Sequence, residues 1–171
     1  FSRLENTSQL TGTDSWQTEI GINAQFYILS ALLMAMIGYI YYFMHRYSMR
    51  TVMRPAYLWV PLGSVVACGG MTLIGFLPKG YEVAICLLAM FNSYVTANAR
   101  FLLGKDDIKG FNLTFMLQGG LLFFVLMGFY YGLHQPTVGA YVAGLFVTNS
   151  IALIVSALRL WPYLRQERPL A

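Results

Sequence analysis

Five long apolar runs constrain this chain more than any other feature of its sequence. The hydrocarbon core of a bilayer is about 30 Å thick, which a helix of about 20 residues crosses. No water is present there to bond the backbone amides, so a spanning segment of that length must bond internally as a helix. Barrel strands would be about ten residues long and alternate in polarity, which these runs do not. The runs cover residues 25–45, 56–77, 81–103, 111–132 and 137–160.

The composition supports the same interpretation. Apolar residues make up 57% of the 171 positions and charged residues 11%, whereas soluble domains are about 45–50% apolar and about 25% charged. The predicted fold class is all-α, a polytopic membrane helix bundle with five transmembrane helices across residues 21–163. Residues 1–20 are polar and lack the apolar core of a signal peptide. Because the chain starts at Phe1 rather than Met, we expect it to be a piece of a longer protein.

The positive charges predict the orientation of the bundle. Lys and Arg are retained in the cytoplasmic loops of membrane proteins. The first and third loops, the C-terminal tail at residues 164–171 and the adjoining span ends hold nine of the 11 cationic residues, so we expect them to be cytoplasmic. Residues 1–20 would then be extracytoplasmic. The nine are Arg46, Arg50, Arg54, Arg100, Lys105, Lys109, Arg159, Arg165 and Arg168.

Several classes of function lack the residues they need. No Asp or Glu lies in the middle of a span, which leaves no acidic relay for a proton pump, and no lysine lies inside a span to form a Schiff base. His45 and His134 are both at span ends, so no cofactor, haem or metal site is expected. Cys68 and Cys86 lie in apolar runs and are predicted to act as small apolar side chains. We expect no catalytic residue, no enzymatic activity and no nucleic-acid partner.

The fifth run carries small residues at four-residue spacing. This spacing places them on one helix face, and a face of small residues lets two helix backbones approach closely in lipid. The run is therefore predicted to pack tightly against a neighbouring helix. The helix-packing residues are Ala140, Gly144, Thr148, Ala152 and Ser156.

A row of polar residues marks the third run. Asn92, Thr96 and Arg100 share four-residue spacing, and Gln118 and Asn149 in the next two runs are candidates to join them. Polar side chains in hydrocarbon face the bundle interior, a partner or a water-filled cavity. Two interpretations stay open: the wall of a polar substrate cavity, or hydrogen bonds between helices with the Arg100 side chain reaching the cytoplasmic surface.

Residues 81–163 resemble part of a known family of transporters. The matching pieces are FLLGKDDIKGFN at residues 101–112, the pair Leu117-Gln118, and a last apolar run with basic residues at its end, at residues 140–166. They are similar to polysaccharide flippases of the multidrug/oligosaccharidyl-lipid/polysaccharide exporter superfamily, in which this turn joins the fourth and fifth helices on the cytoplasmic side. Family members consist of two pseudo-symmetric lobes with more helices than this chain holds. The resemblance implies a fragment of the N-terminal lobe.

The resemblance also implies a substrate and its contacts. Such flippases move an undecaprenyl-diphosphate-linked oligosaccharide from the inner to the outer leaflet of the bacterial cytoplasmic membrane, for surface polysaccharide export. Arg100 would attract the diphosphate near the cytoplasmic entrance, and Asn92, Thr96 and Gln118 would bond sugar or phosphate oxygens. The partners implied are membrane lipid, the lipid-linked oligosaccharide and the remainder of the transporter.

Two other functions fit a chain with five spans. A non-catalytic accessory subunit of a larger membrane complex would use the small face of the fifth run to dock on partner membrane subunits. A small carrier or channel would assemble from several copies of the chain.

Overall fold

The computed structural model describes residues 21–22, 24–34, 47–77, 80–132 and 138–166. A short helix at Ala24–Met34 comes first. It is followed by α3 (Met49–Leu73), α4 (Glu82–Gly104), α5 (Ile108–Met127) with the π-helical turn η1 (Gly128–Gly132), and α6 (Val138–Gln166). No strand occurs in these described residues, and the predicted all-α bundle is confirmed.

Four of the helices are long and apolar enough to cross a bilayer, so the chain is a helical membrane protein. They are α3, α4, α5 with η1, and α6. The first predicted span, residues 25–45, is described only as far as Met34, and residues 1–20 and 167–171 lie outside the described part of the chain.

The helices extend beyond the apolar runs at the polar ends. α3 begins at Met49, before the run at residues 56–77, because Ser48 caps its first turn by accepting a hydrogen bond from the Thr51 amide at 3.4 Å. At its other end Gly75, with a φ of 72°, takes the left-handed conformation that closes a helix. Hydropathy detects the membrane core of a helix, whereas capping groups set its ends.

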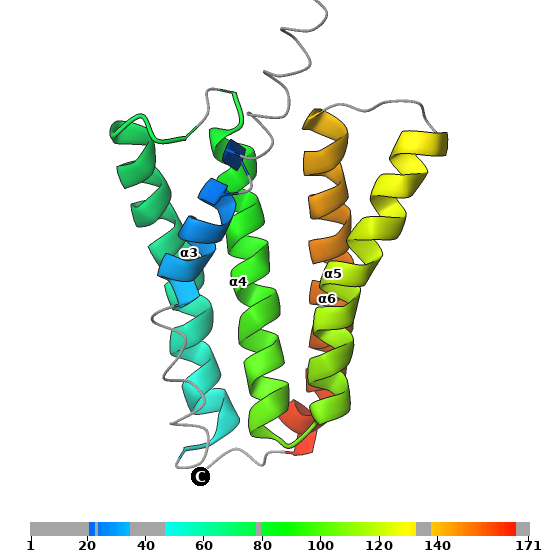
Figure 1. Ribbon diagram of the computed structural model, residues 1–171. Coiled ribbons are helices and arrows are strands. Elements are labelled where there is room, and N and C mark those ends of the chain that lie inside the picture. Colours follow the sequence, from blue (N-terminus) through cyan, green and yellow to red (C-terminus); the bar gives the residue numbers. More distant parts are fainter. Residues whose placement is uncertain (1–20, 23, 35–46, 78–79, 133–137, 167–171) are drawn as a thin grey trace, which may run out of the picture.

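α4 lies in the middle of the bundle, with α3 on one side and α5 and α6 on the other (Figure 1). The start of α3, the α4–α5 turn and the end of α6 lie together at one end of the bundle. We call it the basic end, because its described cations are Arg50, Arg54, Arg100, Lys105, Lys109, Arg159 and Arg165. The α3–α4 loop lies at the opposite end (Figure 1).

Two clusters of buried apolar side chains hold the helices together. Near the opposite end, Phe26 and Leu29 of the short helix pack with Ile85 of α4 and Leu145 of α6. Near the basic end, Phe101 of α4 packs with residues of α3 and with Leu160 of α6. Many apolar side chains outside these clusters remain exposed, among them Leu58 at 72% and Phe124 at 71%. Such a surface is expected where lipid replaces water.

The small face predicted on α6 lies largely inside the bundle. Gly144, Thr148, Ala152 and Ser156 are buried, and Ala140 is half-buried. A Cβ at Gly144 would lie 3.2 Å from Leu126 Cδ2 of α5, so the two helices approach closely here. By contrast, a Cβ at Gly128 or Gly132 would meet no atom within 4 Å in the described structure.

Replacing Gly144 by Leu should therefore destabilise the fold. The new side chain would overlap Leu126, and overpacking of this kind costs about 1–3 kcal/mol. Unfolding in mixed micelles measures this loss. The matched control is Gly120→Leu, since a Cβ at Gly120 of α5 meets open space. Equal stability of the two variants would contradict the close approach of α5 and α6.

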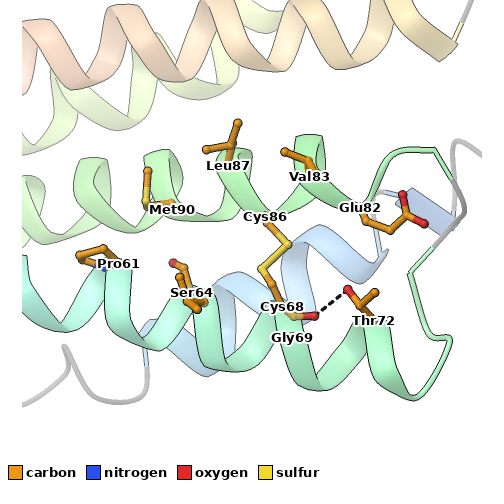
Figure 2. A pocket seen from close by; sticks show the side chains of 11 residues that line it. Pro61, Ser64, Cys68, Gly69, Thr72, Glu82, Val83, Cys86, Leu87 and Met90 are labelled. Carbon is orange, nitrogen blue, oxygen red and sulfur yellow. Dashed lines mark hydrogen bonds between the residues drawn. A yellow bond between two sulfur atoms is a disulfide. The ribbon is translucent and has the colours of Figure 1, made fainter.

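The prediction that both cysteines act as separate apolar side chains is wrong. Cys68 of α3 and Cys86 of α4 form a disulfide, with their Cα atoms 5.9 Å apart. Both lie about one turn from the α3–α4 loop, in antiparallel helices, so they face each other across the helix pair. Figure 2 shows the bond crossing a groove between α3 and α4 that is also lined by Pro61, Val83 and Leu87.

Reduction of this bond should lower stability. A crosslink between residues 18 positions apart removes unfolded-state entropy worth about 3 kcal/mol. Unfolding in mixed micelles with and without reductant tests this, and Cys68→Ala/Cys86→Ala should no longer respond to reductant. Alkylation of both thiols in the denatured, unreduced protein would contradict the pairing.

Candidate functional site

A polar cavity lies between the short helix, α4, α5 and α6. Its volume is about 360 Å³. We call it the central polar cavity. It is lined by Phe26, Tyr27, Asn92, Thr96, Phe115, Gln118, Gly119, Leu122, Leu145 and Asn149.

Gln118 connects the three long helices around this cavity. Its Nε2 donates to Asn92 Oδ1 on α4 and, at 3.0 Å, to Asn149 Oδ1 on α6. Asn149 Nδ2 in turn donates to the Leu145 carbonyl at 2.8 Å, within its own helix. The side-chain amide of α5 is thus held between amides of its two neighbours, which fixes the position of all three groups.

Three polar groups of the cavity have no protein partner within the described part of the chain. These are Asn92 Nδ2, Gln118 Oε1 and the Thr96 hydroxyl. They comprise a donor, an acceptor and a group that does both. None carries a charge. With the aromatic side chains of Phe26, Tyr27 and Phe115 around them, they form a surface suited to a neutral ligand rich in hydroxyl groups, because pockets of this kind join apolar walls to a few fixed polar groups.

The structure brings three of the four predicted site residues together. Asn92, Thr96 and Gln118 line the cavity, and Asn149 joins them. Arg100 does not line it: its side chain is exposed, one helical turn beyond Thr96 and about 6 Å further along the axis toward the basic end. The polar row accordingly supplies both a cavity wall and hydrogen bonds between helices.

A second set of polar side chains lies nearer the basic end, and each of its members is hydrogen-bonded. The Tyr57 hydroxyl of α3 donates to Asn98 Oδ1 of α4, and Asn98 Nδ2 donates to Ser156 Oγ of α6 at 2.9 Å. Ser156 Oγ donates to the Leu153 carbonyl at 3.0 Å. Asn98 and Ser156 are fully buried. Because every member is paired, we regard this group as a structural link between three helices.

Sequence reasoning missed parts of both groups. Phe26, Tyr27 and Phe115 carry no signal in a sequence where aromatic residues are 16% of all positions. Tyr57 was not singled out, because its partner Asn98 is 41 residues away. One usable signal was present: Asn98 is an amide inside an apolar run, and Ser156 belongs to the small face of α6. A buried amide next to a small face needs a partner on the opposing helix.

No known protein family, curated protein or solved structure matches this chain. Among the described residues, no three His, Cys, Asp or Glu side chains come together in a way that would hold a metal ion. The candidate site therefore depends on the geometry of the central polar cavity alone.

Alanine at Asn98 should cost more stability than alanine at Gln118. Asn98→Ala leaves the half-buried Tyr57 hydroxyl without its acceptor and removes a fully buried amide that also bonds Ser156, which costs about 1–3 kcal/mol. Gln118→Ala removes bonds beside a cavity that water can enter, and such bonds average about 0.6 kcal/mol in membrane bundles. Unfolding of both variants in mixed micelles gives the order. A larger loss of stability for Gln118→Ala would show that the hydrogen bonds of Gln118 at the cavity, rather than those of Asn98, hold the helices together.

Proposed function

We propose that this chain is part of a membrane transporter that moves a lipid-linked oligosaccharide across the bacterial cytoplasmic membrane. The observation that carries the proposal is the central polar cavity, where Asn92, Thr96 and Gln118 offer unpaired polar groups between membrane helices. The resemblance of residues 81–163 to polysaccharide flippases supports the substrate class.

The depth of the cavity favours transport over a purely structural role. Asn92, Gln118 and Asn149 lie near the middle of α4, α5 and α6, at the depth where a polar group is most costly in lipid. Substrate sites of secondary transporters also lie near the bilayer midplane, at the interface of packed helices. A sugar can exchange its water for these side chains there.

Two independent features support an orientation with the basic end in the cytoplasm. The cations gather at that end, which is the distribution that short cytoplasmic loops show. The Cys68–Cys86 disulfide lies near the opposite end, and disulfides persist on the oxidising, extracytoplasmic side. The N-terminus of this segment would be outside and its C-terminus inside.

In this orientation the proposed site has two parts. Arg100, exposed one turn below the cavity, would hold the diphosphate at the cytoplasmic entrance, because a guanidinium bonds phosphate oxygens through two parallel N–H groups. The neutral amides and Thr96 would bond the sugar hydroxyls above it. The prenyl chain would stay in the lipid. No bond is made or broken, so the proposed activity is transport without catalysis.

One observation favours a second candidate, an accessory subunit of a larger membrane complex. Only Gly110 and Thr114 of α5 are buried. On the outer surface of α5 and η1, a Cβ added at Gly120, Gly128 or Gly132 would meet no atom within 4 Å in the described structure. Another membrane helix would fit there. In a transporter, the remainder of the same protein would cover this surface.

The test uses the full-length protein in a strain that lacks the gene. We expect Gln118→Ala and Arg100→Gln to lower surface polysaccharide at equal membrane abundance, and the lipid-linked oligosaccharide to accumulate in the inner leaflet. The loss of a hydrogen bond to a charged group, about 1.5–3 kcal/mol, corresponds to a reduction of about tenfold to 100-fold for Arg100→Gln.

Arg159→Gln is the matched control, since Arg159 is an exposed cation at the same end on α6 that does not line the cavity. Normal polysaccharide in Arg100→Gln would remove Arg100 from the mechanism. Normal polysaccharide in both Gln118→Ala and Asn92→Ala would remove the central polar cavity, and with it this proposal.

A further inference from the structure

A second pocket, with largely apolar walls and two arginines among its lining residues, lies at the basic end, between the start of α3 and the end of α6. Its volume is about 260 Å³, and it is lined by Arg50, Met53, Arg54, Tyr57 and Leu164. We call it the α3–α6 pocket. It shares no lining residue with the central polar cavity. Neither the hydrogen bonds of the cavity nor the proposed transport accounts for it.

The pocket gathers positive charge. Arg50 and Arg54 are four residues apart and therefore lie on the same face of α3, one turn above the other. They occupy the first two turns, where the helix dipole is already positive and where acidic residues would be favoured instead. The first turn of α3 contains no acidic residue. An anion bound here would offset this concentration of positive charge.

Arg50 is also fixed in place. One of its terminal nitrogens, Nη2, donates to the Leu164 carbonyl of α6 at 2.6 Å. A guanidinium has five N–H donors and can bond more than one acceptor at once. The bond joins the start of α3 to the end of α6 and holds a cationic group at the pocket wall.

Within the described part of the chain, no carboxylate lines this pocket. The acidic residues described are Glu82, at the opposite end, and Asp106 and Asp107, in the α4–α5 turn. The Asp107 carboxylate is used by its own helix, where it accepts from the Gly110 amide at 2.8 Å. None of these three carboxylates therefore neutralises Arg54 in the pocket.

The remaining wall is apolar and continues into the lipid-facing surface. The hydroxyl of Tyr57 is bonded to Asn98, so the pocket meets the ring of Tyr57 rather than a free hydroxyl. Met53 and Leu164 complete the wall. Further along α3, Leu58 and Leu62 are 72% and 60% exposed. A ligand with a phosphate at Arg54 and an acyl chain beside Leu58 would match both parts of this surface.

We propose that the α3–α6 pocket binds the phosphate group of an anionic membrane phospholipid, with Arg54 and Arg50 as its ligands. Basic pockets between transmembrane helices bind anionic head groups, and arginine bonds a phosphate through two parallel N–H groups. The apolar wall selects the lipid over free phosphate. This inference needs a chain that spans a membrane, but not the transport of an oligosaccharide.

Lipid retention on the purified full chain tests the proposal. The protein is equilibrated with equimolar phosphatidylglycerol and phosphatidylcholine in mixed micelles, and bound lipids are counted by native mass spectrometry. We expect a preference for phosphatidylglycerol that falls about fivefold in Arg54→Gln and further in Arg50→Gln/Arg54→Gln, given the usual contribution of one arginine near an anionic surface. Arg54→Lys should retain part of it.

Three controls make the outcome decisive. Arg159→Gln, which removes an exposed cation of α6 outside the pocket, should leave the preference unchanged. Inorganic phosphate at millimolar concentration should not displace phosphatidylglycerol. Glu167 follows α6 in the sequence, and Glu167→Gln should leave the preference equal or stronger.

Several results would overturn the proposal. Equal lipid retention in the wild type and Arg50→Gln/Arg54→Gln would show that the pocket holds no lipid. An equal loss in Arg159→Gln would indicate a diffuse surface charge. Displacement by inorganic phosphate alone would identify a site for a free anion, and a preference seen only in Glu167→Gln would mean that the pocket is already neutralised. Single-variant losses are read only for protein that elutes as the wild type does in size-exclusion chromatography.

Discussion

The absence of water inside the bilayer is the constraint on which this structure depends. A polar side chain there must find its partner within the bundle or face a cavity that admits polar molecules. Asn98 meets the first condition, with Tyr57 and Ser156 as partners on two other helices. Asn92 meets the second, since its Oδ1 is bonded to Gln118 and the residue lines the central polar cavity. Both belong to α4, the helix at the middle of the bundle.

Most of the fold was readable from the sequence, because hydropathy reports directly on the requirement for self-bonded helices. The runs at residues 81–103 and 111–132 correspond closely to α4 and to α5 with η1. The start of α3 was misplaced because Ser48 and the arginines after it are polar, and capping is invisible to hydropathy. The sequence did not predict the disulfide, because each cysteine by itself fits an apolar run. Their similar distances from one short loop were the available signal.

The candidate site was less predictable, because four-residue spacing defines a face of one helix but not what opposes it. Asn92 and Thr96 of α4 and Gln118 of α5 line the same cavity. Arg100 has the same spacing, yet the cavity ends before it. The aromatic walls come from the short helix and from α5, through packing that no local pattern encodes. The same holds for the α3–α6 pocket, whose walls are contributed by segments 114 residues apart, as Arg50 and Leu164 are.

The distribution of bonds along α4 also divides the bundle into a fixed part and an adjustable part. α3 is tied to α4 by the disulfide near one end and by the fully paired Tyr57–Asn98 contact toward the other. Sliding α3 against α4 would strain a covalent bond or leave the buried Asn98 amide without its partner on α3. α5 is bound differently: its polar link is Gln118, whose bonds border a cavity where water or a ligand can replace them. A ligand could therefore replace the bonds of Gln118 within the cavity while α3 and α4 stay together as a unit and α5 keeps its packing against α6.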